Sequence, residues 1–425
     1  MNNNNTQQYD VIIIGSGTCG STIARNLAAE GKSVLVLEKG ADAAIVESVM
    51  GVASVAKEVA VSKGVMAAIA EMAGGSTGLY FGVVRYPQLA DFDELGIDLS
   101  QELAKVTQDL PLGPLDDSLI SPQSFKLRDS AAQLGLEFYK NDLLVDQSQC
   151  SGGYNFNARW RARSYLDDAC QSGAVLITKA QVEKILIENN QAVGVQYQQK
   201  SGWFGSKTQV AHGKAIILAA GALASPQLLR QTGVKDIAKK GFYYDPGMAV
   251  FGLVPGLEGK NSFVGSMSCD LAPGVELGDA NVSSLFYKLL MLSEFKFKHF
   301  FKYHQAVGIG VKVTDGLAGE IDEKGRFNKD LNDSEQQLIE QGQQAAVKIL
   351  KQAGAEHIFA TKLTSSGHVG GTIRIKEHVD ENLQTQFNNL YVCDGSLLPE
   401  NIRVTPTLTL VCLAEYLSKQ LLARL

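Results

Sequence analysis

A glycine-rich turn between two apolar segments near the amino terminus constrains the fold more than any other feature. The turn Gly15-Ser16-Gly17-Thr18-Cys19-Gly20 follows the apolar run 9–14, and it precedes a helical pattern and a second apolar run, 33–37, which leads to Glu38. In such a unit the first glycine permits the turn, the second admits a pyrophosphate to the helix amino terminus, and the third lets helix and strand pack closely. The pattern predicts a dinucleotide-binding fold in which Glu38 accepts a hydrogen bond from a ribose hydroxyl. The alternative is a tight turn in another kind of α/β protein.

Two later segments indicate which dinucleotide is bound. Residues 215–221 form an apolar run that ends at Gly221, and residues 389–395 form a second run that ends at Asp394-Gly395. A cofactor held by segments near residues 15, 221 and 395 must be long and must tie the two ends of the chain together. We therefore expect FAD, and an NAD-dependent dehydrogenase is the alternative.

The sequence resembles the glucose-methanol-choline (GMC) oxidoreductase family of flavoproteins over nearly its whole length. Residues 221–234 resemble the second signature of the family, with Gly-Ala, Ser-Pro and Leu-Leu pairs in place, although Thr232 and Lys235 replace the usual serine and glycine. Residues 74–78, Gly-Gly-Ser-Thr-Gly, resemble the core of the first signature, which lies along the flavin. Tyr80 stands where the family usually has Asn or His.

The resemblance implies FAD as the cofactor and assigns its contacts to the matching positions. Val182 matches a strand that contacts the adenine edge through its backbone, and the alternative is an ordinary strand of the cofactor domain. The full set of expected cofactor-binding residues is Gly15, Gly17, Cys19, Gly20, Glu38, Gly75, Ser76, Val182, Gly221, Ser225, Asp394, Gly395, Pro406 and Thr407.

Two residues near the carboxyl end are the candidates for catalysis. His368 lies in a glycine-rich segment, and the resemblance implies that it acts at the flavin as the base, while Thr405 occupies the partner position that is usually Asn or His. Alcohol oxidation removes a proton from oxygen as hydride leaves carbon for flavin N5, and a histidine with an unperturbed pKa of about 6.5 suits the first task. A threonine hydroxyl can hold a substrate oxygen but is no base. The alternatives are a histidine that only braces the flavin and a threonine that only caps a helix.

The segment after Thr405 has the pattern of a helix. Thr405 followed by Pro406 matches an N-cap with proline at the first helical position. The residues that follow include a helically spaced apolar set, namely Leu408, Cys412, Leu413, Tyr416 and Leu417. The resemblance implies that this helix points its partly positive amino terminus at the flavin N1 and C2 carbonyl, where it would favour the reduced flavin.

The order of these segments predicts an α/β fold, α+β overall, with an interrupted domain. A Rossmann-like FAD-binding domain would use residues 9–90, 150–235 and 385–425, after a disordered tail at 1–8. A smaller substrate domain with an antiparallel sheet would use residues 91–149 and 236–384. Further expected elements are a strand at 307–313, an amphipathic helix at 334–352 and a helical stretch near the flavin at 43–73.

Two segments have more than one reading. Residues 286–303 interleave aromatic side chains with lysines, which favours a strand or lid of the substrate domain, or alternatively a membrane-surface segment that admits an apolar substrate. Arg159, Arg161 and Arg163 favour a solvated basic strand edge, and the alternative is that one of them binds an acidic substrate.

Composition excludes several classes of protein. The net charge of -6 argues against a nucleic-acid binder. The six cysteines are scattered, which predicts a reducing compartment, the cytoplasm, and no metal site. No run of eighteen apolar residues is present, and the first eight residues lack the pattern of a secretory signal, so we expect neither a membrane span nor a leader.

These features together predict an FAD-dependent oxidoreductase. It would oxidise the CH–OH group of an apolar or partly apolar alcohol, with His368 as the base and O2 or another acceptor taking the electrons. One alternative is a flavoenzyme of the same fold that catalyses desaturation or fatty-acid decarboxylation, and the threonine at position 405 motivates it. A second is a catalytically silent flavin-binding interaction protein.

Overall fold

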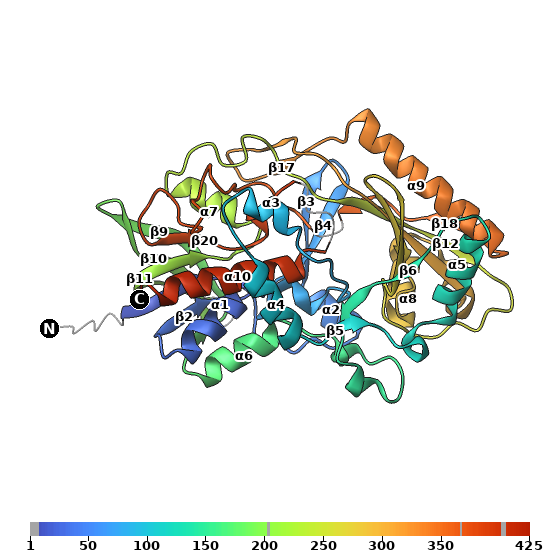
Figure 1. The fold of residues 1–425 in the computed structure, drawn as a ribbon, viewed down its shortest axis with the longest axis horizontal. Helices are drawn as coiled ribbons and strands as arrows, with labels where there is room; N and C mark the ends of the chain where they lie inside the picture. Colours follow the sequence, from blue (N-terminus) through green and yellow to red (C-terminus); the bar gives the residue numbers. More distant parts are fainter. Residues whose placement is uncertain (1–7, 202–204, 366–367, 401–404) are drawn as a thin grey trace.

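The computed structural model describes residues 8–201, 205–365, 368–400 and 405–425. The tail predicted over residues 1–8 lies outside this part of the chain, except for Gln8, which begins the first strand. Figure 1 shows one mixed sheet with its helices toward one end of the molecule and a second sheet with its own helices toward the other. The predicted fold class is confirmed, because the two sheets are of the two expected kinds.

The first sheet has the strand order β8-β2-β1-β11-β10-β9, and β20 pairs with β11. Neighbours among β8, β2, β1, β11 and β20 run parallel, whereas β9 and β10 are antiparallel additions. The central strands are apolar and buried on both faces, as parallel strands under helices usually are. The strands are β1 (Gln8–Ile14), β2 (Val34–Leu37), β8 (Val175–Ile177), β9 (Ala180–Glu188), β10 (Gln191–Ser201), β11 (Gly205–Leu218) and β20 (Leu390–Val392).

Four helices pack together on the first sheet. The apolar face predicted for the helix after the glycine turn is buried, including Ile23, Leu27 and Ala28. This helix, α1, contacts α6 and α10, and α10 in turn contacts α4. The bounds are α1 (Thr18–Ala29), α4 (Ser100–Asp109), α6 (Arg163–Gln171) and α10 (Thr407–Leu422), and the shorter helices are α3 (Leu89–Asp93) and α7 (Ser225–Gln231).

The second sheet is antiparallel, with the order β18-β12-β15-β14-β13-β6 and with β19 beside β12. Helices α5 and α9 pack on it, and the strand predicted at 307–313 and the helix predicted at 334–352 are confirmed as β15 and α9. The elements are α5 (Pro122–Ala132), α9 (Asp333–Gln352), β6 (Tyr139–Lys140), β12 (Pro246–Leu253), β13 (Met267–Ala272), β14 (Val275–Asp279), β15 (Ala306–Val313), β18 (Glu356–Ala360) and β19 (Thr364–Ser365).

Two predicted elements are wrong. The stretch 43–73 is a short helix, α2 (Val49–Val55), followed by a hairpin of β3 (Ala56–Ser62) and β4 (Val65–Ala70), because its valines suit an extended chain and Gly64 makes the turn at φ 79°. Residues 286–303 form no strand; they form α8 (Ser284–Ser293), the 3-10 helix Phe297–His299 and the start of a second 3-10 helix.

Small sheets complete the fold. Strands β5 (Leu112–Pro114) and β7 (Asp142–Leu144) pair with each other, as do β16 (Glu320–Ile321) and β17 (Phe327–Asn328).

Within the described residues, no helix combines the length and the apolar character that crossing a bilayer requires. The division of the chain into two domains at the expected boundaries stays a prediction.

A buried ion pair fixes the segment that enters β12. Lys329, directly after β17, contacts the carboxylate of Asp315, and both side chains are fully buried. The Asp315 carboxylate accepts hydrogen bonds from the backbone N–H groups of Tyr244 at 3.1 Å and Asp245 at 2.8 Å. Burial raises the pKa of Asp315 to about 6, although Lys329 acts in the opposite direction. The pair therefore holds the backbone of Asp245 in place.

We expect Lys329→Met to destabilise the protein by roughly 3–5 kcal/mol, because it leaves the Asp315 carboxylate buried without a counter-charge. Thermal unfolding followed by circular dichroism measures the effect as a lower Tm. Lys324→Met, at an exposed position of the same segment, is the matched control and should leave the Tm unchanged. Equal Tm values for the two variants would show that the pair contributes nothing to stability.

Candidate active site

Four loops meet at one edge of the first sheet. Gly15, Glu38 and Gly221 lie just beyond β1, β2 and β11, and Asp394 lies just beyond β20. These strands are parallel neighbours, so their carboxyl ends lie at the same edge. The structure therefore brings together the segments near residues 15, 221 and 395, as the sequence predicts. Such an edge is where open α/β sheets bind ligands.

The glycine turn has the geometry that the motif predicts. Gly15 has φ 99°, and a Cβ on it would lie 2.4 Å from the carbonyl oxygen of Ala219. A Cβ on Gly20 would lie 2.0 Å from the carbonyl oxygen of Gly15, so helix and turn touch there. A Cβ on Gly17 would meet no described atom within 4 Å, and Gly17 gives α1 no side-chain cap. Helix α1 thus offers free backbone N–H groups beside open space, which fits the diphosphate of a dinucleotide.

The Glu38 carboxylate accepts three hydrogen bonds, two of them from the glycine turn. Its Oε2 accepts from the Ser16 backbone N–H at 3.0 Å and from the Ser16 hydroxyl at 2.6 Å, while its Oε1 accepts from the Gly40 N–H at 2.6 Å. A carboxylate oxygen can accept two hydrogen bonds, so Oε1 retains a free acceptor position for a ribose hydroxyl. Buried Cys19 lies behind the turn, and its thiol contacts the carbonyl oxygen of Leu410 at 3.4 Å.

Asp394 locks the carboxyl-terminal segment onto the loop after β11. Its Oδ2 accepts from the Gly221 N–H at 2.9 Å and from the Ser225 hydroxyl, and its Oδ1 accepts from the Ser396 N–H at 2.9 Å. Burial raises the pKa of Asp394, and these donors oppose that shift. Gly395 begins the 3-10 turn that follows. The aspartate thus explains why Gly221, Ser225 and the residues around 395 form one unit.

The segment 74–78 lies directly on the glycine turn. The Gly74 N–H donates to the Ser16 hydroxyl at 3.2 Å, and a Cβ on Gly75 would lie 2.7 Å from Cα of Gly17. Ser76 accepts a hydrogen bond from the Ala70 N–H at 3.3 Å, which joins the segment to β4. The predicted placement of Gly75 and Ser76 beside the cofactor turn therefore agrees with the geometry.

The residues around Tyr80 are more buried than the sequence predicts. The Tyr80 hydroxyl donates to the carbonyl oxygen of Trp160, and Arg159 donates to the Tyr80 carbonyl oxygen at 2.7 Å. Burial lowers the pKa of Arg161 to about 10, and its guanidinium donates to the Phe156 carbonyl oxygen at 2.9 Å. The expected solvated basic strand edge is wrong for these two arginines, because aromatic rings and carbonyl oxygens enclose them.

Arg163, the third arginine of that prediction, and Val182, the predicted adenine contact, have other environments. Arg163 begins α6 and pairs with Asp42 and Asp167. Val182 lies in β9 opposite Tyr197 of β10, with its side chain buried. Its backbone contact with an adenine stays a prediction.

His368 belongs to a cluster of three charged or titratable groups. Its Nδ1 lies 3.3 Å from Oδ2 of Asp245 and 3.2 Å from Nζ of Lys312, and these two atoms of Lys312 and Asp245 are 3.4 Å apart. Backbone hydrogen bonds between Tyr243 and Gly370 in both directions hold the histidine loop against the segment that leads through Asp245 into β12. With Nδ1 engaged by the protein, Nε2 is the ring nitrogen left for a substrate.

The cluster favours a neutral imidazole. Burial lowers the pKa of His368, the charge of Lys312 lowers it further, and Asp245 opposes both. Burial would raise the pKa of Asp245, but Lys312 and His368 outweigh it and the pKa is lowered. With the hydrogen on Nδ1, the Asp245 carboxylate 3.3 Å away is the negative group beside it, and Nε2 is free to take a proton. In the other tautomer Lys312 donates to Nδ1, and Nε2 carries the hydrogen.

Thr405 does not cap the last helix, so that prediction is wrong. Helix α10 begins at Thr407, its N-cap is Pro406, and no side-chain cap is formed. Thr405 has φ 20°, and its buried Oγ1 has no hydrogen-bond partner among the described residues. Residues 401–404 lie outside the described chain. A partnerless hydroxyl next to an uncapped helix amino terminus is a polar site that a ligand can complete.

Asp245 and Lys312 are the residues that the sequence reasoning missed. The available signal was Lys312, a single charged residue inside the otherwise apolar strand 306–313. Antiparallel pairing sets Lys312 opposite Gly247, two residues after Asp245. Asp245 and Lys312 are far apart in sequence, so only the pairing of β12 with β15 shows that they lie together.

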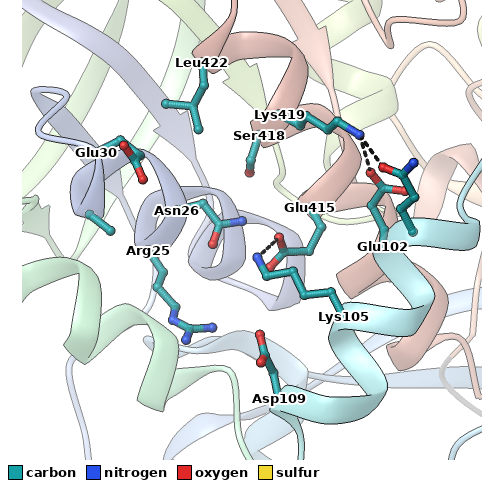
Figure 2. Close-up of a pocket in the computed structure, with 12 residues that line it drawn as sticks. Arg25, Asn26, Glu30, Glu102, Lys105, Asp109, Glu415, Ser418, Lys419 and Leu422 are labelled. Carbon is teal, nitrogen blue, oxygen red and sulfur yellow. Dashed lines mark hydrogen bonds and ion pairs between the residues drawn. The ribbon is translucent and has the colours of Figure 1, made fainter.

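A surface groove lies away from these residues (Figure 2). It has a volume of about 520 Å³, and α1, α4 and α10 form its walls. Both lysines of the groove form ion pairs, since Lys105 Nζ lies 2.6 Å from Glu415 Oε2 and Lys419 Nζ lies 3.6 Å from Glu102 Oε1. None of the predicted site residues lines this groove. Among the described residues, no group of three His, Cys, Asp or Glu side chains could hold a metal ion.

Family models for GMC oxidoreductases match two parts of the chain. The amino-terminal model matches residues 9–246, and the carboxyl-terminal model matches residues 319–414. Together they include the glycine turn, His368 and the uncapped start of α10.

Similar proteins span nearly the whole chain. A long-chain-alcohol oxidase of Arabidopsis thaliana is 23% identical over 97% of this chain and 67% of its own length. An uncharacterized protein of Methanocaldococcus jannaschii is 24% identical over 97% of this chain and 100% of its own length. The crystal structure of pyridoxine 4-oxidase from Mesorbium loti matches with a TM-score of 0.72 at 16% identity, covering 97% of this chain and 99% of that one. This last likeness concerns the fold.

We expect the pKa of the His368 imidazole to lie below the ordinary histidine value of about 6.5, because burial and Lys312 both disfavour its protonation. Proton and ¹⁵N NMR of histidine-labelled protein measures both the pKa and the tautomer, and His368→Ala assigns the signal among the six histidines. Lys312→Met removes a positive charge and should raise this pKa, whereas Asp245→Asn removes a negative charge and should lower it further. A His368 pKa that neither substitution moves would contradict the cluster.

Proposed function

The chain belongs to the GMC oxidoreductase family, whose members use FAD to oxidise CH–OH groups, and on this premise we propose that it oxidises an apolar or partly apolar alcohol with His368 as the base. The observation that carries the proposal is the contact of His368 Nδ1 with Asp245, 3.3 Å away, which leaves Nε2 available. The resemblance of the chain to a long-chain-alcohol oxidase supports the choice of an apolar substrate.

In the proposed reaction the chain's own residues manage the proton and the substrate oxygen. FAD, when bound, supplies the acceptor for the hydride that leaves the alcohol carbon. Neutral His368 takes the hydroxyl proton at Nε2, while Asp245 holds Nδ1–H and stabilises the imidazolium that forms. The buried Thr405 hydroxyl donates a hydrogen bond to the alcohol oxygen, which gives this group the partner that the protein does not provide.

The same proposal assigns the cofactor contacts. Gly15, Gly17, Cys19 and Gly20 form the turn and helix end that take the diphosphate, and Glu38 takes a ribose hydroxyl. Val182 lies along the adenine. Gly75, Ser76 and the unit formed by Gly221, Ser225, Asp394 and Gly395 would hold the flavin, together with Pro406 and Thr407 at the amino terminus of α10.

The electron acceptor in the proposal is O2 or another oxidant. An apolar alcohol concentrates in lipid, so peripheral contact with a membrane is part of the same proposal. The six cysteines are all free thiols, which suits a reducing compartment such as the cytoplasm.

Thr405 motivates a second candidate function. At the position where the family usually has Asn or His it provides only a short hydroxyl, which could suit a flavoenzyme that desaturates or decarboxylates a lipid acid. Bound flavin that no alcohol reduces, together with turnover of a lipid acid, would favour this candidate. Bound flavin with neither reaction would indicate a silent flavin-binding protein.

We expect at least one apolar alcohol to bleach the flavin band when purified protein is mixed anaerobically with primary, secondary, sterol and sugar alcohols in a stopped-flow instrument. His368→Ala should slow this reduction by on the order of 100-fold or more, because the proton then has no positioned base. His212→Ala, in β11, is the matched histidine control. Reduction of the His368→Ala protein at the normal rate would remove this residue from the role of base.

We expect Thr405→Val to preserve the Tm and the FAD content but to slow flavin reduction several-fold, the effect of one lost hydrogen bond. Replacing a buried hydroxyl that has no protein partner should cost no stability, so the rate isolates its role toward substrate. Thr405→Asn restores both the residue type usual in the family and a hydrogen-bond donor. An unchanged rate in Thr405→Val would show that the hydroxyl does not contact the alcohol.

A further inference from the structure

An exposed aromatic tip projects from the second sheet. It consists of residues 292–302, between α8 and the 3-10 helix Tyr303–Gln305. Three phenylalanines are largely exposed, Phe295 at 75%, Phe297 at 59% and Phe301 at 84%, and Leu292 is 44% exposed. Single exposed apolar residues are common on protein surfaces, but a cluster of this kind in one short segment marks an interaction site.

The tip is held rigidly in this orientation. Tyr287 and Met291 of α8 are buried with Tyr303 against Phe251 and Leu253 of β12. The Tyr287 hydroxyl also donates to the carbonyl oxygen of His299 at 3.0 Å, which ties the 3-10 helix to α8. Buried side chains on both sides of the tip therefore fix the backbone from which the exposed rings extend.

The backbone of the tip is strained at one of its exposed phenylalanines. Phe295 has φ 55°, a left-handed conformation that is unusual for an aromatic residue. Such conformations cost energy and persist only when the surrounding structure imposes them. The fold thus maintains a strained residue whose ring is three-quarters exposed.

The tip is also positively charged on an acidic protein. Lys288, Lys296, Lys298 and Lys302 surround the phenylalanines, and Glu294 is the one acid among them, whereas the whole chain has a net charge of -6. None of these four lysines forms an ion pair within the described chain. The pKa of His299 is lowered by burial and by Lys298, Lys296 and Lys302, which shows the positive field at this surface.

We propose that the aromatic tip docks the protein on a membrane that contains anionic lipids. Exposed aromatic rings insert at the boundary between headgroups and acyl chains, and unpaired lysines bind the anionic headgroups around them. A second copy of the chain fits the tip less well, because face-to-face pairing of two tips would bring six lysines together. The combination of exposed rings with unpaired positive charge is therefore best matched by a bilayer.

Vesicle binding tests the proposal with the FAD-loaded protein. We expect co-sedimentation with phosphatidylcholine–phosphatidylserine vesicles, weaker binding to pure phosphatidylcholine vesicles, and weakening by salt. The triple substitution Lys296→Gln, Lys298→Gln, Lys302→Gln should reduce the affinity on the order of 100-fold. Substituting Phe295, Phe297 and Phe301 together by Ser should reduce it at least tenfold.

A control variant with the same loss of charge separates the effect of the tip from that of net charge. Lys63→Gln, Lys324→Gln, Lys351→Gln removes the same charge at exposed positions elsewhere and should retain binding. All variants should keep the FAD spectrum and Tm of the original chain, because the substituted side chains are at the surface. The proposal is overturned if the original chain does not bind anionic vesicles, or if the tip variants and the control bind alike. It is also overturned if the Phe variant loses only a dimer seen by analytical ultracentrifugation.

The docking inference rests on the proposed function in one respect, namely that the membrane would supply the apolar alcohol. Vesicle binding is measured without turnover, so the two can fail separately. Binding by a protein whose flavin no alcohol reduces would leave the docking surface in place and remove the proposed substrate. Flavin reduction by alcohols without vesicle binding would do the reverse.

Discussion

The rest of the site depends on β11, which pairs in parallel with β1 on one side and with β20 on the other. Ile216 lies opposite Ile12 of β1 and Leu390 of β20, so one buried strand aligns the two ends of the chain. Parallel ladders place the loops that follow at the same edge. The glycine turn, the loop at Gly221 and Asp394 therefore meet because of backbone pairing, and the Asp394 hydrogen bonds then fix the loops against one another.

Behind His368, two lysines and two aspartates form a row of charged groups from the interior to the site. Fully buried Lys329 contacts Asp315, Asp315 binds the backbone N–H of Asp245, and the carboxylate of Asp245 lies between Lys312 and the imidazole. Two lysines face two aspartates, so the row is close to neutral when the histidine is neutral. A proton added to His368 makes the row positive in a buried place, which is why its pKa is low and why it suits a base.

Elements that depend on the local sequence pattern could be predicted from the sequence. Contacts that depend on the register between paired strands could not. The glycine turn, β15 and α9 follow from spacing within short segments. The Ala and Val-rich stretch 43–73 was misassigned because such runs suit helices and strands alike, and only Gly64 marks the hairpin. Asp245 and Lys312 were missed because the pairing of β12 with β15 brings them together. The cap expected at Thr405 failed because α10 begins at Thr407, so that Pro406 and not Thr405 occupies the N-cap position.

The same two strands join the chemistry to the aromatic tip. Strand β12 begins directly after Asp245 and ends at Leu253 against Tyr287, and β15 begins at Ala306 beside the tip and carries Lys312 near its other end. Eight extended residues span roughly 25 Å, so a membrane at the tip lies about that far from the imidazole. An apolar alcohol taken from lipid must then leave the bilayer before it reaches His368. The second sheet thus serves both sites, because its register sets Lys312 beside Asp245 and its other end packs against the base of the tip.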